Sequence, residues 1–256
     1  MDIQDIILSE LDKVEQQHGV RIIHSVESGS RSWGFASPDS DYDVRFIYVG
    51  PAADYIRLDE PRDMIEWKLD KVLDINGWDL KKALKLFARS NATMFEWSES
   101  PVVYKTTEEW ERVREVSKQY FSVKSTAYHY YGTAMSTWAG YLKEDTVRYK
   151  KYFYALRPLL AARYIEQFHA VPPVLFEDLL KMDMEPELRS AIDDLVEKKK
   201  ITTEGEYHPH IPIIRDFILE ELQKQKSICD SLPDDRNADL TALNRCFAEM
   251  IGFGIM

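Results

Sequence analysis

Residues 27–50 have the sequence ESGSRSWGFASPDSDYDVRFIYVG, which joins a glycine-serine turn to a cluster of acids and then to an apolar run. The turn is Gly29-Ser30, and the acids are Asp39, Asp41 and Asp43. A buried carboxylate without a partner is costly. Acids placed directly before a buried strand therefore indicate either a solvated turn or a bound cation.

The spacing of the acids separates them into two kinds. Asp39 lies between Pro38 and Ser40, a composition typical of a turn. Side chains alternate along a strand, so Asp41 and Asp43 point to one face with their Cα atoms about 7 Å apart. Such a pair is either a solvated strand entry or part of a site for Mg²⁺, which prefers a few carboxylates, waters and substrate phosphates.

A third carboxylate from a neighbouring strand would complete a metal site. The sequence VLDIN at residues 72–76 supplies Asp74, an acid with apolar residues on both sides. Glu66, in MIEWKL at 64–69, has a similar setting, and Asp79 is a further alternative.

The glycine-serine turn adds a site for an anion. Gly29 permits close approach of the backbone, Ser30 offers a hydroxyl, and N–H groups at a turn or helix start bind phosphate oxygens. Neither Gly-Ser nor Asp-x-Asp is specific alone. Their combination, separated by residues 31–40 and followed by an acid between apolar residues, indicates a site for a phosphorylated ligand and a metal ion.

Outward from this segment, the chain divides into an α+β part and a helical part. Apolar residues at 3.6-residue spacing predict a helix over 77–90, and almost everything after residue 106 has a helical pattern. We therefore predict two domains, 1–105 and 106–256. The predicted strands are 21–27, 43–50, 64–69 and 71–76, and the predicted later helices are 106–121, 122–143, 147–169, 185–199, 211–231 and 237–251.

Composition limits the class of protein. The 256 residues are 45% hydrophobic and 30% charged, as in a globular protein with its own core. The net charge of −11 argues against broad non-specific binding of nucleic acid, although not against a local basic groove. No apolar run suits a membrane span, and residues 1–19 form an amphipathic pattern rather than a signal peptide, so we expect a cytoplasmic protein. Reduced thiols are favoured for Cys229 and Cys246 over a disulfide.

One basic helix stands out in this acidic chain. The sequence VRYKKYFYALRPLLAAR at 147–163 contains no acid. Lys150, Tyr154 and Arg157 follow i, i+4, i+7 on one face, and Lys151 is adjacent. This face is either a solvated surface or a contact for a triphosphate and a base. Pro158 predicts a kink or restart of the helix.

Three segments carry a resemblance to a known superfamily. They are SGSRSWGFASPDSDYDVRFIYV, LDINGWDLKKALKLFARSNATMFEWSESPVVY and KKYFYALRPLLAARYI. The first resembles the DNA polymerase β-like nucleotidyltransferases. The second and third are similar to the YcgL-like or RlaP group of predicted nucleotidyltransferases, which is associated with RNA repair.

The resemblance implies a polymerase-β-like catalytic domain and a set of roles. Asp41, Asp43 and Asp74 match the acids that hold two Mg²⁺ or Mn²⁺ ions, and Gly29 and Ser30 match positions that hold a nucleoside triphosphate such as ATP. Further nucleotide contacts are expected from Arg31, Lys150, Lys151, Tyr154 and Arg157. Arg31 and Arg45 either counter the aspartates or contact phosphate.

The implied activity is metal-dependent transfer of a nucleoside monophosphate to a hydroxyl. The RNA-repair association favours an RNA end as acceptor. A protein hydroxyl, as in antitoxin-like nucleotidyltransferases, and a non-catalytic nucleotide or RNA sensor remain alternatives. No membrane partner is expected.

Overall fold

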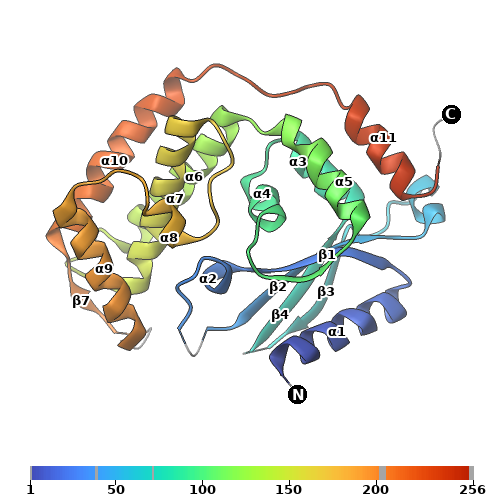
Figure 1. The fold of residues 1–256 in the computed structure, drawn as a ribbon, viewed down its shortest axis with the longest axis horizontal. Coiled ribbons are helices and arrows are strands. Elements are labelled where there is room, and N and C mark those ends of the chain that lie inside the picture. The colour runs from blue at the N-terminus through green and yellow to red at the C-terminus, as the bar shows by residue number, and fades with distance from the viewer. Residues whose placement is uncertain (1, 38–39, 71, 202–205, 254–256) are drawn as a thin grey trace. The chain divides into compact units, whose positions relative to one another are not determined.

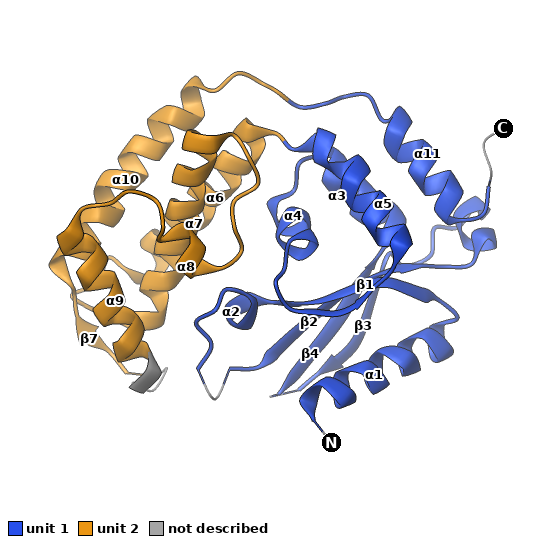
Figure 2. Cartoon of the chain, viewed as in Figure 1, with its two compact units in different colours: residues 1–121, 236–256 blue, residues 122–235 orange. Residues whose placement is uncertain are grey.

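The computed structural model describes residues 2–37, 40–70, 72–201 and 206–253. These residues form two compact units (Figure 2). Unit 1 comprises Met1–Phe121 and Arg236–Met256, and unit 2 comprises Ser122–Asp235. The predicted turn at Pro38 and Asp39 lies outside the described residues.

Unit 1 is built on a mixed five-stranded sheet, whose strands are β1 Arg21–Ser28, β2 Tyr42–Val49, β3 Met64–Leu69, β4 Leu73–Asp79 and β5 Val103–Thr106. Their order in the sheet is β3-β4-β2-β1-β5. The central strand β2 pairs antiparallel with β1 and parallel with β4, and β3 pairs antiparallel with β4. The edge strand β5 has four residues and was absent from the sequence prediction.

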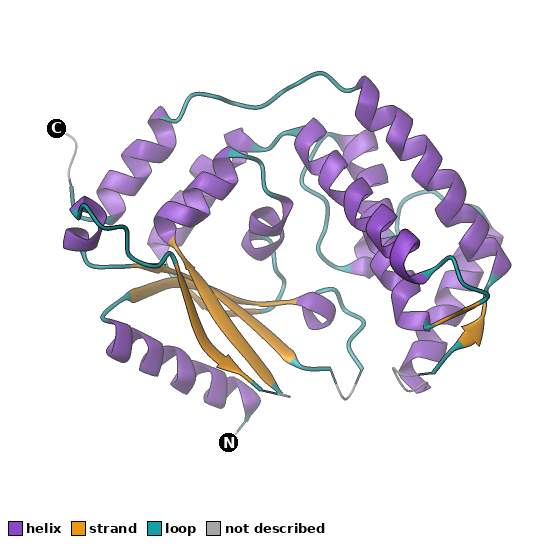
Figure 3. Ribbon diagram, turned by 180° about the vertical axis from the view of Figure 1, so that it is seen from behind, coloured by secondary structure: helices purple, strands orange, loops and turns teal. Residues whose placement is uncertain are grey.

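Helices cover both faces of this sheet (Figures 1 and 3). On one face, α1 (Ile3–His18) buries Ile7 and Leu11 against Val44 and Ile75 of the sheet. On the other face lie α3 (Leu80–Ala88), α4 (Ala92–Ser98) and α5 (Glu108–Ser117). The remaining elements of unit 1 are α2 (Gly29–Ser32), α11 (Thr241–Met250) and the 3₁₀ turns η1 (Ala52–Ile56) and η2 (Lys118–Tyr120).

The helix predicted to start at residue 77 begins at Leu80. Residues 77–79 continue β4, where a Cβ on Gly77 would lie 2.2 Å from the ring of Phe46. Asp79 then caps the helix by accepting a hydrogen bond from the Lys81 N–H. Residues 77–79 therefore belong to β4, which packs closely against β2, although their apolar spacing also fits a helix.

In the described part of unit 2, the regular elements are helices apart from one short strand pair. Its α7 (Tyr149–Phe168) continues through Pro158, so the helix does not restart there. An internal proline costs about 3 kcal/mol, which burial of the whole run 155–162 offsets. The elements are α6 Val123–Tyr141, β6 Thr146–Val147, α7 Tyr149–Phe168, α8 Phe176–Leu179, α9 Pro186–Ile201, β7 His208–Pro209 and α10 Pro212–Ser231.

The division of the chain differs from the predicted domains 1–105 and 106–256. The helix α5 packs Trp110 and Val113 into unit 1, and the chain returns to that unit with α11. The Tyr120 hydroxyl donates a 2.6 Å hydrogen bond to the Asp239 carbonyl, which joins the two segments. Helical periodicity identified these helices but contains no information on which core they cover.

Two smaller expectations concern the cysteines and the membrane. Cys229 and Cys246 are both buried free thiols. Within the part of the chain that the structure describes, no helix combines the length and the apolar character needed to cross a bilayer.

Candidate active site

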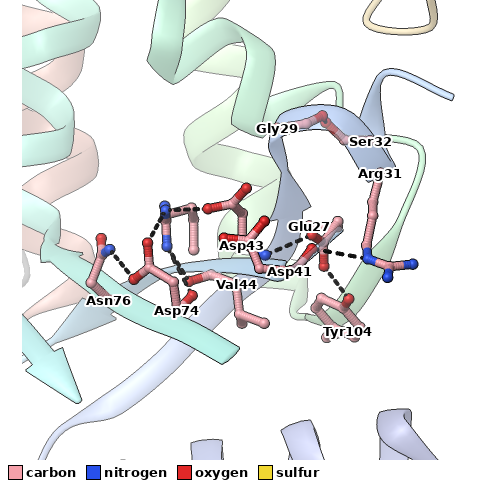
Figure 4. A network of polar contacts seen from close by, with 11 residues as sticks. Glu27, Gly29, Arg31, Ser32, Asp41, Asp43, Val44, Asp74, Asn76 and Tyr104 are labelled. Carbon is pink, nitrogen blue, oxygen red and sulfur yellow. Dashed lines mark hydrogen bonds and ion pairs between the residues drawn. The ribbon is translucent and has the colours of Figure 1, made fainter. Parts of the chain in front are cut away.

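Strand register brings two of the predicted acids together. Asp43 on β2 lies directly opposite Asp74 on the parallel strand β4. Paired residues of neighbouring strands point to the same face, so the two carboxylates project side by side (Figure 4).

The two alternative acids lie elsewhere. Glu66 is exposed on the edge strand β3, opposite Asn76 rather than Asp74. Asp79 is at the far end of β4, where it caps α3 and accepts a 2.6 Å hydrogen bond from the Tyr55 hydroxyl. Asp74 is therefore the acid that the sheet places beside Asp43.

A guanidinium group bridges the two acids. Nη2 of Arg45 lies 2.8 Å from Oδ1 of Asp43 and 2.7 Å from Oδ2 of Asp74. Nη1 donates to the carbonyls of Asp74, at 2.9 Å, and Val44, at 3.1 Å. Of the two roles left open for Arg45, the structure shows the first, because its charge neutralises the aspartates.

The third predicted acid is nearby but less enclosed. Asp41 is exposed and directly precedes β2. Burial is the main cause that raises the pKa of Asp43, Arg45 lowers it, and the charges of Asp41 and Asp74 raise it further. The three acids therefore interact electrostatically at one strand end.

Whether the acid cluster can hold a metal ion depends on the position of Arg45. Within the described ranges, no three His, Cys, Asp or Glu side chains form a group that could hold a metal ion. The donor atoms are carboxylate oxygens, the type that Mg²⁺ and Mn²⁺ prefer, and a cation already lies between two of them. Asp43 and Asp74 are thus suited to a cation, but coordination of a metal by all three acids requires Arg45 and Asp41 to move.

The glycine-serine turn packs against Asp43. Gly29 begins α2 with a φ of 65°, and a Cβ at this position would lie 2.4 Å from Oδ2 of Asp43. Ser30 follows in the same turn, and the Ser32 hydroxyl donates to the Gly29 carbonyl at 2.9 Å. Both the close approach and the positive φ require glycine here.

A buried acid that the sequence analysis missed supports this arrangement. Glu27 is only 1% exposed and accepts a 2.7 Å hydrogen bond from the Asp43 N–H. It also accepts a hydrogen bond from the Tyr104 hydroxyl, and burial raises the pKa of Glu27. The only signal in the sequence was an acid at the end of the predicted strand 21–27, two residues before Gly29.

Comparison with known proteins identifies the family. The RlaP family, described as "RNA repair pathway DNA polymerase beta family", matches residues 3–249. The chain belongs to this family. It is similar to the uncharacterized protein YcgL of Bacillus subtilis (strain 168), with 39% identity over 241 residues and coverage of 93% of each protein.

A solved structure also matches this RlaP-family chain. It is a nucleotidyltransferase-like protein from Exiguobacterium sibiricum 255-15, with 10% identity and a TM-score of 0.32. The match covers 94% of this chain and 78% of that one. The resemblance inferred from the sequence is confirmed by the family and by the YcgL relative.

Arg31, also predicted to bind nucleotide, contacts the backbone of the loop that leads into β2. Arg31 donates from Nε to the Asp41 carbonyl at 2.9 Å and from Nη2 to the Ser40 carbonyl at 2.6 Å. Its guanidinium lies 3.7 Å from the ring centroid of Tyr42. These contacts hold the backbone just before β2, and binding of nucleotide by Arg31 stays a prediction.

The remaining predicted residues lie on α7 in unit 2. Lys150 and Lys151 are half-buried, Tyr154 is exposed, and Nζ of Lys151 lies 3.6 Å from the Tyr141 ring centroid. Arg157 is only 3% exposed, and its Nε donates to the Val174 carbonyl at 3.2 Å. A packing role accounts for Arg157, whereas the other three are accessible to a ligand of unit 2.

We expect Arg45→Met to destabilise the metal-free protein and to tighten its binding of Mn²⁺. Without the guanidinium, Asp43 and Asp74 repel each other, which we expect to cost about 2 kcal/mol of unfolding free energy. The same loss removes the cation with which a metal ion competes. Thermal melting without metal and calorimetric titration of Mn²⁺ measure the two effects.

Arg21→Met is the matched control for Arg45→Met. Arg21 is also a strand arginine paired with an acid, Glu109, and it lies outside the acid cluster. Its loss should leave Mn²⁺ affinity unchanged. Equal or weaker Mn²⁺ binding by Arg45→Met would show that Arg45 does not compete with the metal.

Proposed function

We propose that this chain is a metal-dependent nucleotidyltransferase that transfers a nucleoside monophosphate from a nucleoside triphosphate to a hydroxyl group at an RNA end. The observation that carries this proposal is the packing of the Gly29 turn against Asp43, which itself lies beside Asp74. A turn that offers backbone N–H groups and a pair of cation-binding carboxylates are the two parts that a triphosphate and its counter-ions need.

The proposed reaction is attack of a hydroxyl group on the α-phosphorus of a nucleoside triphosphate, which carries several negative charges. The acceptor oxygen forms a bond to the α-phosphorus, the bond from that phosphorus to the bridging oxygen breaks, and pyrophosphate leaves. Divalent ions held by Asp43, Asp74 and Asp41 would lower the pKa of the attacking hydroxyl and neutralise the triphosphate. The protein's part is mainly positioning.

Each residue of the site has a role in this proposal. Gly29 and Ser30 bind triphosphate oxygens through the turn. Glu27 fixes the backbone of Asp43 through its hydrogen bond to the Asp43 N–H. Arg45 neutralises the acid pair when no other cation is present.

The family description supports RNA as the acceptor. The test is incubation of the chain with each α-labelled nucleoside triphosphate, Mg²⁺ or Mn²⁺, and an RNA pool with defined ends. We expect label on RNA, release of pyrophosphate, and loss of both in EDTA. Label on the protein itself or on an added protein would instead establish protein nucleotidylation, and nucleotide binding without transfer would establish a sensor.

Lys151→Ala is expected to weaken binding of the triphosphate more than it lowers stability. Lys150→Ala should behave alike, because the basic segment of α7 offers cations without neighbouring acids in sequence. The effect should shrink with added salt, since screening limits exposed charges to about 8 Å at physiological ionic strength. Titration of nucleotide at low and high salt measures it.

Lys181→Ala is the control for these α7 variants, because Lys181 is an exposed lysine of unit 2 paired with Asp178. It should change neither affinity nor salt dependence. If Lys150→Ala and Lys151→Ala also bind nucleotide normally, the basic face is a solvated surface and the triphosphate contacts are confined to unit 1.

A further inference from the structure

Unit 1 contains a pocket of about 780 Å³ that the proposed chemistry does not use. It lies where β2 and β4 end, and its lining includes Gly50, Tyr55 and Asp79. Asp79 is five residues along β4 from Asp74, which corresponds to about 16 Å. The pocket is therefore at the opposite end of the strands from the acid pair.

One wall of the pocket is a stripe of positive charge. Lys81 and Lys85 line it from one face of α3, and Arg89, the residue that directly follows the helix, continues the i, i+4, i+8 spacing. Successive members are separated by about 6 Å along the helix axis. Arg62 adds another cation from the loop before β3.

Most of the acids in the pocket already have partners. Glu60 lies 3.9 Å from Lys81, Asp63 lies 3.0 Å from Lys82, and Asp54 lies 3.4 Å from Arg57. Asp79 is buried, and both of its oxygens accept hydrogen bonds from the protein. These four acids are therefore poorly placed to neutralise further cations, and the remaining acid of the lining, Glu66, is exposed and lies outside these pairs.

Three cations of the pocket form no ion pair with any residue that the structure describes. Among the described residues, no carboxylate lies within 4.0 Å of the charged groups of Arg62, Lys85 or Arg89. Lys85 and Arg89 are also exposed. In a chain with a net charge of −11, unpaired cations gathered on a concave surface favour a ligand with several negative charges.

We propose that this pocket binds the sugar-phosphate backbone of the RNA acceptor, several nucleotides away from the end that reacts. This inference rests on the proposed function and adds to it a second contact region for the same substrate. A row of evenly spaced cations suits successive phosphates better than a single compact anion. Lys85 and Arg89 bind the phosphates, and affinity is sensitive to salt and insensitive to base sequence.

The experiment compares Lys85→Ala/Arg89→Ala with Lys13→Ala/Lys118→Ala. The control pair removes exposed lysines of unit 1 that lie outside the pocket and are paired with Glu10 and Glu115. Binding of a labelled single-stranded RNA of mixed sequence is measured over a range of salt concentrations. We expect the pocket variant to lose about tenfold or more in affinity at low salt, and its slope of log K against log salt to fall by about 1.4, for two lost phosphate contacts.

A second measurement uses the distance between the pocket and the acid pair. The KM for a long RNA acceptor should rise in the pocket variant, while the KM for a dinucleotide acceptor and for the triphosphate should not. A dinucleotide is too short to reach from Asp74 to the stripe. A rise for the dinucleotide or the triphosphate would place the stripe at the reaction centre and overturn the proposal.

The outcomes separate this inference from the proposed function. If the wild type transfers nucleotide to RNA but the pocket variant keeps the affinity and salt slope of the control pair, the pocket is not an RNA site and the proposed function stands. If the wild type binds the triphosphate but neither binds nor modifies RNA, RNA is not the acceptor, and both proposals fail.

Discussion

Asp43→Asn is expected to reduce nucleotidyl transfer by about 10³-fold or more, which corresponds to about 4 kcal/mol of transition-state stabilisation. Asp43 is the residue on which the site converges. It contacts Arg45, lies opposite Asp74, packs against Gly29 and receives its backbone support from Glu27. Asn keeps the shape of the side chain but removes the charge that a cation needs.

The fold should survive Asp43→Asn. Burial raises the pKa of Asp43, so its charged form is more costly in the folded state than in the unfolded state. Removal of this charge at neutral pH should therefore leave the melting temperature unchanged or slightly higher. Circular dichroism and thermal melting test this expectation alongside the activity assay.

Glu66→Gln is the control for the choice of acids, with Asp74→Asn as its counterpart. Asp74 lies opposite Asp43, whereas Glu66 is exposed on the edge strand. We expect Asp74→Asn to be nearly inactive and Glu66→Gln to be active. The reverse result would move the third carboxylate to β3 and overturn the assignment.

Gly29→Ala is expected to reduce transfer by about 10²-fold, equal to about 2.7 kcal/mol. The added methyl group would lie 2.4 Å from Oδ2 of Asp43, so the turn or the carboxylate must shift. The positive φ adds strain of about 1–2 kcal/mol for any residue with a Cβ. Both effects act at the point where the turn meets the acid pair.

Gly19→Ala separates the two effects in Gly29→Ala. Gly19 has a similar φ of 61°, but a Cβ there would meet nothing within 4 Å. Both variants should lose comparable stability from backbone strain, and only Gly29→Ala should lose activity and Mn²⁺ affinity. Similar activities of the two variants would indicate that the contact with Asp43 has no part in the reaction.

The sequence predicted those parts of the site that depend on local spacing. Alternation placed Asp41 and Asp43 on one face, and the flanking residues of Gly29 and Asp74 made both recognisable. Asp74 became the preferred third acid through the resemblance to nucleotidyltransferases, because local pattern alone does not distinguish it from Glu66. The parallel pairing of β2 with β4 places Asp74 rather than Glu66 opposite Asp43, and pairing between strands is a long-range property.

The parts that were not predicted depend on packing across elements. Arg45 bridges two acids only because β4 lies beside β2, and Glu27 becomes a buried support only because Tyr104 of β5 reaches it. Arg157 had the spacing of a surface cation but is buried beside Val174. In each case the sequence gives the type of side chain, and the neighbouring element gives its role.

The return of the chain to unit 1 has a consequence for how this protein can be taken apart. The Gln119 carbonyl accepts a hydrogen bond from the Asn237 side chain at 3.4 Å, next to the bond between Tyr120 and Asp239. The Ser122 hydroxyl and the Val123 N–H likewise bond to Asp235 within unit 2. Unit 2 is thus inserted into unit 1 with its two ends close together. We expect that joining residues 121 and 236 removes unit 2 and leaves unit 1 folded, whereas truncation before α11 opens the core of unit 1.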